Sequence, residues 1–326
     1  MPNRFFVSLI GLILAVSSAA QARSPINLEV LRRDGYGVVQ LFQVRENVLT
    51  VNAVVNGQKV KLELDTGFAG GIGLDSRFSG VNIGTLGETR RGSGVTGKTI
   101  EVRRGAAKTV VMGNVQLTDV PVEVGAFKTW DEERGQKFTS ALAFDMDIGN
   151  QGGAAGFIGR DFLRTNSAVI DLPNHLLYLK PPGKGKRAQL SGALTNVGMG
   201  EAPIVDGDQV NVEVNGVPAR MYVDTGAVAT LLDPRFAGKA NARGYGSTDM
   251  EFRDIAGAKS KVDLTGLTNF KIGGIPTRSS TATLAPASFY SASGGKIVGL
   301  LGIDFLGQNW GIIDFGQQKL YFAKAK

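Results

Sequence analysis

The feature that most constrains this sequence is an internal repeat: a segment ending in Asp65-Thr66-Gly67 returns 159 residues later, ending in Asp224-Thr225-Gly226. Both copies keep an Asn-Gly dipeptide at the same distance before Asp-Thr-Gly. Asn-Gly strongly favours a two-residue hairpin turn, because both central positions of a type I′ turn need positive φ. Each copy is therefore expected to form a strand, a tight turn, a second strand and a loop that carries an aspartate.

The repeat continues towards the end of each copy. Residues 156–163 (GFIGRDFL) correspond to residues 299–306 (GLLGIDFL), now 143 residues apart. The shorter offset means that the first copy holds about 17 extra residues before Gly156, in a stretch that contains Trp130. Since duplicated sequence implies duplicated fold, we expect a first lobe at 23–180 and a second at 192–326. The Pro-, Gly- and Lys-rich residues 181–191 are typical of a linker between them.

The composition favours a mainly β fold. The sequence contains 45 glycines and 11 prolines, scattered rather than clustered, which suits a protein with many tight turns. A hydrophobic content of 43% with 20% charged residues is typical of a packed globular protein. There is no cysteine, which excludes both disulfides and a thiol nucleophile.

The first 22 residues have the pattern of a signal peptide. Arg4 supplies the positive start, Phe5 to Val16 form a short apolar run, and Ala20-Gln21-Ala22 is a small-x-small cleavage site. We expect cleavage near Ala22, a periplasmic or secreted mature protein, and no stable membrane span after cleavage, since no later segment is longer or as free of charge. Retention of this segment as an uncleaved anchor is the alternative.

The formal net charge of +7 could indicate an acidic partner. Lys and Arg are nevertheless spread along the chain in short clusters, without interleaved aromatic residues. This pattern favours a solvated basic surface over a nucleic-acid interface, and an exported protein rarely meets nucleic acid. We expect no nucleic-acid partner.

The two aspartates, taken as a pair, indicate acid–base catalysis. A single Asp-Thr-Gly is weak evidence, because Asp and Gly are common in turns. Two carboxyl groups a hydrogen bond apart, by contrast, cannot both ionise. They share one proton, so that one acts as base and the other as acid. We predict Asp65 and Asp224 to be catalytic. Each glycine would allow the sharp turn after the aspartate, and each Thr hydroxyl would hydrogen-bond across the base of the loop to hold the aspartate. The predicted supporting residues are therefore Thr66, Gly67, Thr225 and Gly226.

Together with the Phe-Ile-Gly-Arg-Asp-Phe-Leu and Leu-Leu-Gly-Ile-Asp-Phe-Leu segments, these motifs resemble the retropepsin-like aspartic peptidases over most of residues 45–326. The resemblance implies two β-barrel lobes in the bilobal arrangement of pepsin-like enzymes, made by duplication. It also implies that a glycine-containing hairpin in each lobe folds over the substrate as a flap. The tentative flap residues are Gly94, Val95, Thr96, Gly97, Ala256 and Gly257. The sequence departs from the family at Phe68 and Val228, where small or polar residues are usual, and at Ile303, which replaces the arginine found at Arg160.

The resemblance implies an aspartic endopeptidase that hydrolyses peptide bonds of an envelope or secreted protein, through a water activated between the two aspartates. It requires no cofactor or metal, and one chain carries both halves of the site, so we expect a functional monomer with a protein or peptide substrate. The alternative is a catalytically inactive periplasmic module that keeps the cleft and binds peptides. A third hypothesis is a latent enzyme, covered by residues 24–45 or by the Trp130 insertion until a partner removes them.

Other signals in the sequence are weaker. Residues 92–99 (GSGVTGKT) match the phosphate-loop pattern, but alternating residues follow instead of a helix, so we expect a hairpin and no nucleotide. His175, the only histidine, lies in a predicted turn and is expected on the surface. Four aspartates recur in both halves and are expected to have structural roles: Asp161, Asp304, Asp171 and Asp314. For Asp161 the expected partner is Arg160 or a nearby backbone amide.

Overall fold

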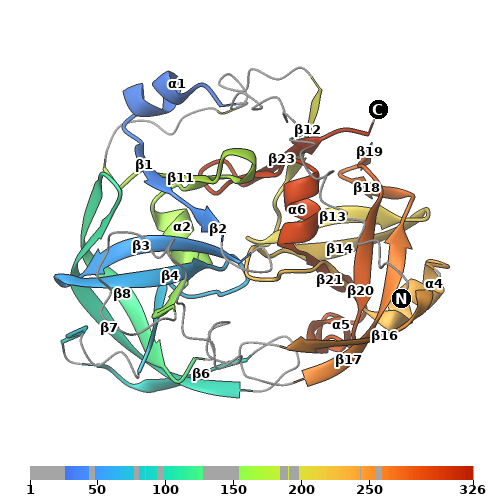
Figure 1. Ribbon diagram of the computed structural model, residues 1–326, viewed down its shortest axis with the longest axis horizontal. Coiled ribbons are helices and arrows are strands. Elements are labelled where there is room, and N and C mark those ends of the chain that lie inside the picture. The colour runs from blue at the N-terminus through green and yellow to red at the C-terminus, as the bar shows by residue number, and fades with distance from the viewer. Residues whose placement is uncertain are drawn as a thin grey trace, which may run out of the picture.

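The computed structural model describes residues 26–43, 48–76, 81–84, 86–93, 99–127, 154–183, 190, 198–242, 244–253 and 259–325. Within these ranges the chain is mainly β, with three sheets and a few short helices, and the predicted all-β class is confirmed (Figure 1). The predicted signal peptide, the Trp130 insertion and most of the predicted linker lie outside the described residues. The predicted lobe boundaries therefore stay predictions.

Strands of the first half form an eight-stranded sheet. In spatial order it contains β2 (Phe42–Gln43), β3 (Leu49–Val55), β4 (Gln58–Leu64), β9 (Gly156–Ile158), β5 (Ile72–Asp75), β8 (Val115–Gly125), β7 (Thr99–Met112) and β6 (Thr89–Ser93). An additional pairing between β3 and β7 closes this sheet on itself, with Ala53 opposite Met112 and Val55 opposite Val110. Closure removes sheet edges and creates an interior that side chains fill.

Strands of the second half form a nine-stranded sheet with corresponding pairings. In spatial order it contains β16 (Gly244–Arg253), β17 (Lys259–Leu267), β20 (Ser280–Leu284), β15 (Leu231–Leu232), β21 (Ile297–Leu301), β14 (Val217–Val223), β13 (Gln209–Val214), β18 (Phe270–Ile272) and β19 (Ile275–Pro276). The β13–β18 pairing, with Val212 opposite Ile272, corresponds to the β3–β7 pairing of the first half. The sequence repeat is thus a repeat of strand pairings.

A six-stranded sheet joins the two halves along the upper part of Figure 1. Its spatial order is β1 (Gly37–Gln40), β11 (Leu176–Leu179), β10 (Val169–Asp171), β22 (Ile312–Asp314), β23 (Lys319–Ala323) and β12 (Met199–Pro203). At its centre β10 and β22 run antiparallel, with Ile170 directly opposite Ile313. These two residues correspond in the repeat, so the approximate twofold axis relating the halves passes between them.

The two Asn-Gly turns have the predicted geometry. Asn56 and Gly57 have φ of 48° and 83°, and Asn215 and Gly216 have φ of 49° and 84°. These values place both central residues of each turn in the left-handed region, which explains the choice of Asn and Gly. Short helices connect or cover the strands: α1 (Leu28–Arg33), α2 (Arg160–Thr165), η2 (Leu172–Asn174), α4 (Pro234–Lys239), α5 (Ser288–Ala292) and α6 (Ile303–Gln308).

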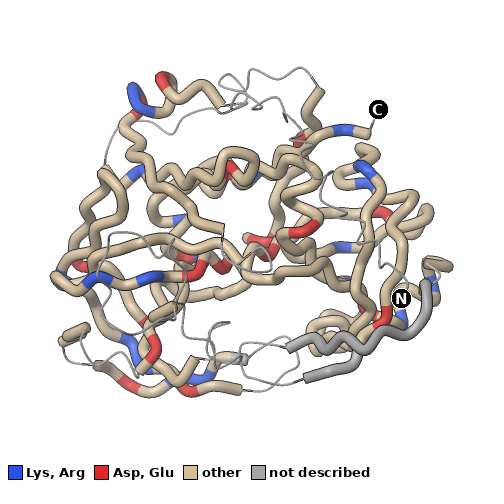
Figure 2. Tube along the Cα trace, in the orientation of Figure 1, with Lys and Arg blue, Asp and Glu red and all other residues tan. Residues whose placement is uncertain are grey.

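One buried apolar cluster extends through both halves and includes Leu62 and Leu64 of β4 together with Met221 and Val223 of β14. These residues flank the two aspartate loops on the chain, so burial of the strands fixes where the loops begin. Among the described residues, Lys and Arg are spread over the trace rather than gathered in one region (Figure 2). Among the described residues, no helix is both long and apolar enough to cross a membrane.

Candidate active site

The fold brings the two Asp-Thr-Gly loops into contact. Asp65 follows β4 and Asp224 follows β14, and each strand is paired in parallel with a short strand from the end of its own half, β9 or β21. The amide of Asp65 donates to Ile158 O and the amide of Asp224 donates to Leu301 O, both at 3.0 Å. The repeated Ile158-Gly159 and Leu301-Gly302 segments therefore anchor the aspartates at corresponding places.

The two threonines lock the loops together by reciprocal hydrogen bonds. The Thr66 hydroxyl donates to Val223 O at 2.7 Å and accepts from the amide of Thr225 at 2.9 Å. The Thr225 hydroxyl donates to Leu64 O at 2.8 Å and accepts from the amide of Thr66 at 3.1 Å. Both side chains are almost completely buried. The threonines therefore support the loops as predicted, and each threonine hydroxyl does so by hydrogen bonds to the loop of the other half.

Each aspartate is held by its own loop and faces the glycine of the other. Asp65 Oδ1 accepts from the amides of Gly67 and Phe68 at 2.9 and 3.0 Å, and Asp224 Oδ1 accepts from the amide of Gly226 at 3.0 Å. A Cβ atom on Gly67 would lie 2.7 Å from both carboxylate oxygens of Asp224, and one on Gly226 would overlap the Asp65 carboxyl. Only glycine allows this approach.

The carboxyl groups lie just below the surface of the protein. Asp65 and Asp224 are 6% and 8% exposed, whereas Gly67 and Gly226 beside them are exposed. The site is therefore largely shielded from bulk water yet open on the side of the two glycines.

Burial and mutual repulsion change the acidity of the pair. Burial raises the pKa of Asp65 to about 8, and the charge of Asp224 adds to this rise, while hydrogen bonds from the amides of Phe68 and Gly67 oppose it. Burial also raises the pKa of Asp224, but hydrogen bonds from the amide of Gly226 and from Asp65 oppose that rise. The two carboxyls share a hydrogen bond, and both are protonated more readily than an exposed aspartate, so the pair can hold one proton between them.

The surroundings of the two aspartates differ. Phe68, which departs from the family pattern, packs against Phe127 and Phe157 with ring centroids 5.6 and 5.9 Å apart. In the second half, the Tyr222 ring packs edge-on against Phe289 at 5.2 Å. Phe68 thus completes a cluster of three aromatic rings, and among the described residues of the second half Ala227 occupies the corresponding position.

Two charged residues near the pair were not predicted to work together. Arg160, the first residue of α2, forms an ion pair with Asp208, which lies just before β13 in the other half. Asp208 O also accepts from the amide of Val223 at 2.8 Å, next to Asp224. The signal was present in the sequence, because the repeat places uncharged Ile303 and Leu49 at the positions that correspond to Arg160 and Asp208.

Three of the four other repeated aspartates have structural roles, as expected. Asp304 Oδ1 accepts from both the amide and the hydroxyl of Thr230 at 2.8 Å. Asp171 caps η2 by accepting from Asn174, and Asp314 accepts from the amide of Gln317 after its strand ends. Asp161 is exposed. Of the two partners expected for Asp161, Arg160 forms its ion pair with Asp208 in the other half instead.

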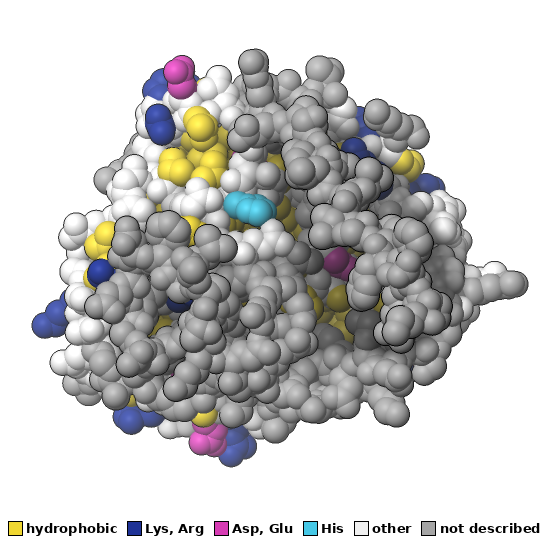
Figure 3. All heavy atoms as spheres, in the orientation of Figure 1, with side chains coloured by type: hydrophobic (Ala, Val, Ile, Leu, Met, Phe, Trp, Pro, Cys, Tyr) yellow, Lys and Arg dark blue, Asp and Glu magenta, His cyan; other side chains and the backbone are white. Residues whose placement is uncertain are grey.

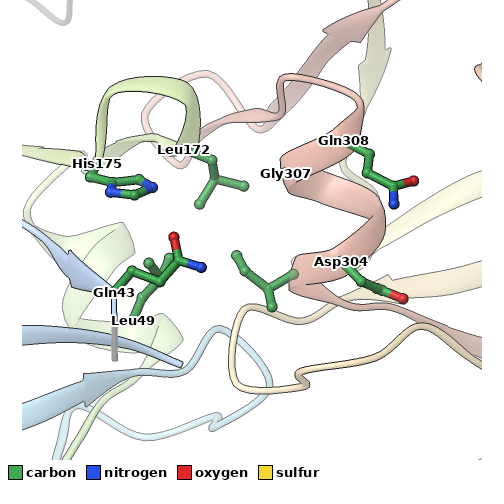
Figure 4. A pocket seen from close by; sticks show the side chains of 8 residues that line it. Gln43, Leu49, Leu172, His175, Asp304, Gly307 and Gln308 are labelled. Atoms are coloured by element: carbon green, nitrogen blue, oxygen red, sulfur yellow. The ribbon is translucent and has the colours of Figure 1, made fainter. Parts of the chain in front are cut away.

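A cavity of about 250 Å³ lies between the halves but away from the aspartate loops. In Figure 4, Gln43, Leu49, Leu172 and His175 line it from the first half, and Asp304, Gly307 and Gln308 line it from the second. His175 lies in the predicted turn, with φ of 51°, and its half-buried side chain is visible on the face drawn in Figure 3. Neither catalytic aspartate lines this cavity.

The predicted flap residues lie outside the described residues, but the strands that lead to them are described. In the first half β6 and β7 pair up to Ser93 opposite Thr99, and in the second half β16 and β17 pair up to Arg253 opposite Lys259. Both hairpins lie along the lower part of Figure 1. The phosphate-loop match is therefore flanked by two antiparallel strands, and no helix follows it.

Two β lobes whose Asp-Thr-Gly loops meet around a proton-sharing carboxyl pair define an aspartic peptidase. Residues 210–305, which include Asp224, match the model of the aspartyl protease family. The crystal structure of the aspartic proteinase from Irpex lacteus is similar in fold, with a TM-score of 0.51 at 15% identity over 90% of this chain and 98% of that chain. No curated protein sequence matches the chain. The family match in the second half and the fold of an aspartic proteinase support an aspartic-type endopeptidase, as the motifs predicted.

Proposed function

We propose that this protein hydrolyses peptide bonds of envelope or secreted proteins with Asp65 and Asp224 as its catalytic pair. The observation that carries the proposal is the buried pair of carboxyls, which share a hydrogen bond beneath two exposed glycines. A water bound on the glycine side would contact both carboxyls and the substrate carbonyl.

In the first step, Asp224 takes a proton from this water as the water oxygen attacks the carbonyl carbon of the substrate. Asp65 donates its proton to the carbonyl oxygen, which gives a neutral tetrahedral diol. In the second step, the carbon–nitrogen bond breaks. The leaving amine takes the proton from Asp224, and one hydroxyl of the diol returns a proton to Asp65. Both carboxyls end as they began, ready for another water.

The amide hydrogen bonds to Asp65 and Asp224 support catalysis by the pair, because they fix both carboxyls before substrate arrives. Preorganised groups of this kind stabilise a transition state without being rearranged during the reaction. The inactive peptide-binding module is not favoured, since a module that only binds would not need two buried, mutually repelling carboxyls.

An envelope or secreted substrate follows from the predicted signal peptide, which would deliver the mature protein to the periplasm or the medium. We propose further that the hairpins β6–β7 and β16–β17 cover an extended substrate, and that the monomer is active because both loops belong to one chain. Specific activity should therefore stay constant on dilution. A proportional loss that accompanies dimer dissociation would contradict the monomer.

The decisive experiment is digestion of a peptide library by the mature protein and by Asp65→Asn and Asp224→Asn. Each change nearly conserves shape but removes one carboxyl, so each should lower kcat by several powers of ten. The double variant should be scarcely worse than either single variant, because the pair acts as a unit. Near-normal turnover by either folded variant would remove the mechanism and leave the binding module as the better explanation.

A further inference from the structure

The cavity between the two halves takes no part in the proposed reaction (Figure 4). Its volume is about 250 Å³. Three aliphatic side chains that line it are almost completely buried, Leu49 and Leu172 from the first half and Ile303 from the second. The side-chain amide of Gln43 and the imidazole of His175 point into it in Figure 4. The cavity therefore combines an apolar wall with two groups that can form hydrogen bonds.

The imidazole of His175 is available to a ligand. The backbone of His175 is fixed, because its amide donates to Leu172 O at 3.2 Å and its carbonyl accepts from the amide of Leu41 at 2.8 Å. Its imidazole makes no hydrogen bond with the described part of the chain. Gln318, the corresponding residue, has nearly the same φ, but its side chain donates to Phe315 O at 3.0 Å. His175 is also visible on the surface in Figure 3, so the cavity can be reached from solvent.

The sequence repeat explains why this side of the interface is hollow. Three positions that line the cavity carry smaller side chains than their counterparts in the repeat: Leu172 against Phe315, Ile303 against Arg160, and Gly307 against Arg164. On the counterpart side the guanidinium of Arg164 occupies the space beside Gly207. A Cβ on Gly307, by contrast, would meet no atom within 4 Å. The cavity thus lies where side chains of the chain itself occupy the other side.

A carboxylate suits the polar end of this cavity. The imidazole of His175 and the amide of Gln43 can both donate hydrogen bonds to it. Among the described residues that line the cavity, Asp304 is the other ionisable one, and its carboxylate points away from the cavity in Figure 4. Its Oδ1 accepts from Thr230 and from the amide of Phe305. The formal net charge of +7 also favours an anion over a cation.

We infer that this cavity binds a small carboxylate with a branched aliphatic body. The carboxylate accepts from His175 and Gln43, and the alkyl group packs against the three aliphatic side chains, where its burial stabilises the complex. Two sources share this chemistry, the C-terminus of a peptide that ends in a leucine-like residue and a short branched fatty acid. Neither catalytic aspartate lines the cavity, so the inference does not rest on the proposed function.

His175 provides the readout, because it is the only histidine and gives a single set of imidazole signals in NMR spectra of the untagged mature protein. Isocaproate and N-acetyl-leucine should both shift these signals, with a Kd of about 1 mM for isocaproate, as is usual for a ligand of this size. Isocaproamide and isoamylamine keep the alkyl group but lack the carboxylate, and should bind about tenfold more weakly. Tighter binding of N-acetyl-leucine than of isocaproate indicates a peptide C-terminus, and the reverse order indicates a fatty acid.

Filling the cavity tests its location. Gly307→Leu places an aliphatic side chain in it and should weaken the binding of both carboxylates by about tenfold or more. Gly238→Leu is the matched control, since Gly238 is also a helical glycine at which an added Cβ meets no atom within 4 Å, but it does not line the cavity. It should bind as the wild-type protein does. If Gly307→Leu does not fold, Leu172→Phe copies the counterpart residue Phe315 and should weaken binding in the same way.

The outcomes are independent of peptidase activity. Asp65→Asn should bind both carboxylates with wild-type affinity, whereas weaker binding by this variant would place the probes at the catalytic pair and overturn the inference. Imidazole signals that stay unshifted up to about 20 mM probe would overturn it too. So would undiminished binding by the folded cavity-filling variant, or equal affinity for isocaproate and isoamylamine. A wild-type protein that cleaves no peptide but binds the carboxylates at His175 would refute the proposed function and support this site.

Discussion

Gly67 lies against the carboxylate of Asp224, at a distance that leaves no room for a methyl group: an added Cβ would be 2.7 Å from Cγ and from both oxygens. The contact links a residue of the first loop to the catalytic group of the second. The geometry of each carboxyl therefore depends on the glycine of the opposite half.

We expect Gly67→Ala to displace the Asp224 carboxylate and to lower kcat by about 100-fold, since a shift of 1 Å in a catalytic group has effects of this size. Gly238→Ala is the matched control, because a Cβ at that position in α4 meets nothing within 4 Å. Steady-state kinetics on one peptide compare the two. Full activity of Gly67→Ala would show that the loops adapt without loss.

The threonine hydrogen bonds make a separate prediction for stability. Thr225→Val removes one hydroxyl and leaves the amide of Thr66 and the carbonyl of Leu64 unsatisfied and buried. Each lost partner costs about 1–3 kcal/mol, whereas Thr225→Ser keeps the hydroxyl and should cost much less. Chemical denaturation measures both variants. Equal free energies of unfolding for Val and Ser would mean that the hydroxyl contributes nothing.

The raised pKa of Asp65 predicts that the protein loses stability as pH rises. The folded state binds the Asp65 proton more tightly than the unfolded state, in which the pKa is close to 3.8. The stabilising contribution is therefore complete below about pH 4 and is lost as pH rises towards 8. Each unit of pKa difference corresponds to about 1.4 kcal/mol.

Asp65→Asn removes this titration, so its free energy of unfolding should fall less between pH 4 and pH 8 than that of the wild-type protein. Asp224→Asn should flatten the curve too, because it removes the charge that repels the Asp65 anion. Urea denaturation at a series of pH values tests this expectation. Parallel curves for wild type and both variants would contradict it.

The repeated aspartates Asp304 and Asp161 should respond differently to substitution. Asp304→Ala removes the acceptor for the amide and hydroxyl of Thr230, and should destabilise the protein by about 1–3 kcal/mol. In the first half the residue that corresponds to Thr230 is Gly71, and Asp161 is exposed. Asp161→Ala should therefore change the free energy of unfolding by less than about 0.5 kcal/mol. Equal losses in thermal denaturation would be inconsistent with this asymmetry.

The sequence predicted the parts of the structure that depend on local chemistry and on duplication. The Asn-Gly turns at residues 56–57 and 215–216 have the expected φ angles because few other residues tolerate them. The meeting of Asp65 and Asp224 was predictable because both lie at the same position of a duplicated unit.

Contacts between residues that differ in the two halves were not predictable in the same way. Arg160 was one of two partners expected for its neighbour Asp161, since local pairing is the default when tertiary structure is unknown. It pairs instead with Asp208, which is remote in sequence and has an uncharged counterpart in the repeat. A search for paired mismatches between the two copies, Arg160 with Ile303 and Asp208 with Leu49, would have found this contact.

The central pairing of β10 with β22 has a consequence for how such a chain can be assembled. Ile170 lies opposite Ile313, its counterpart in the repeat, so two corresponding strands pair symmetrically across the axis. Two identical copies of one half could pair in the same register. A covalent connection is therefore not needed to define this register. A single half could form a homodimer through this pairing. The two halves of this chain, produced as separate polypeptides, could associate through the same pairing. Because one chain carries both halves, corresponding positions can differ, as Arg160 and Asp208 differ from Ile303 and Leu49.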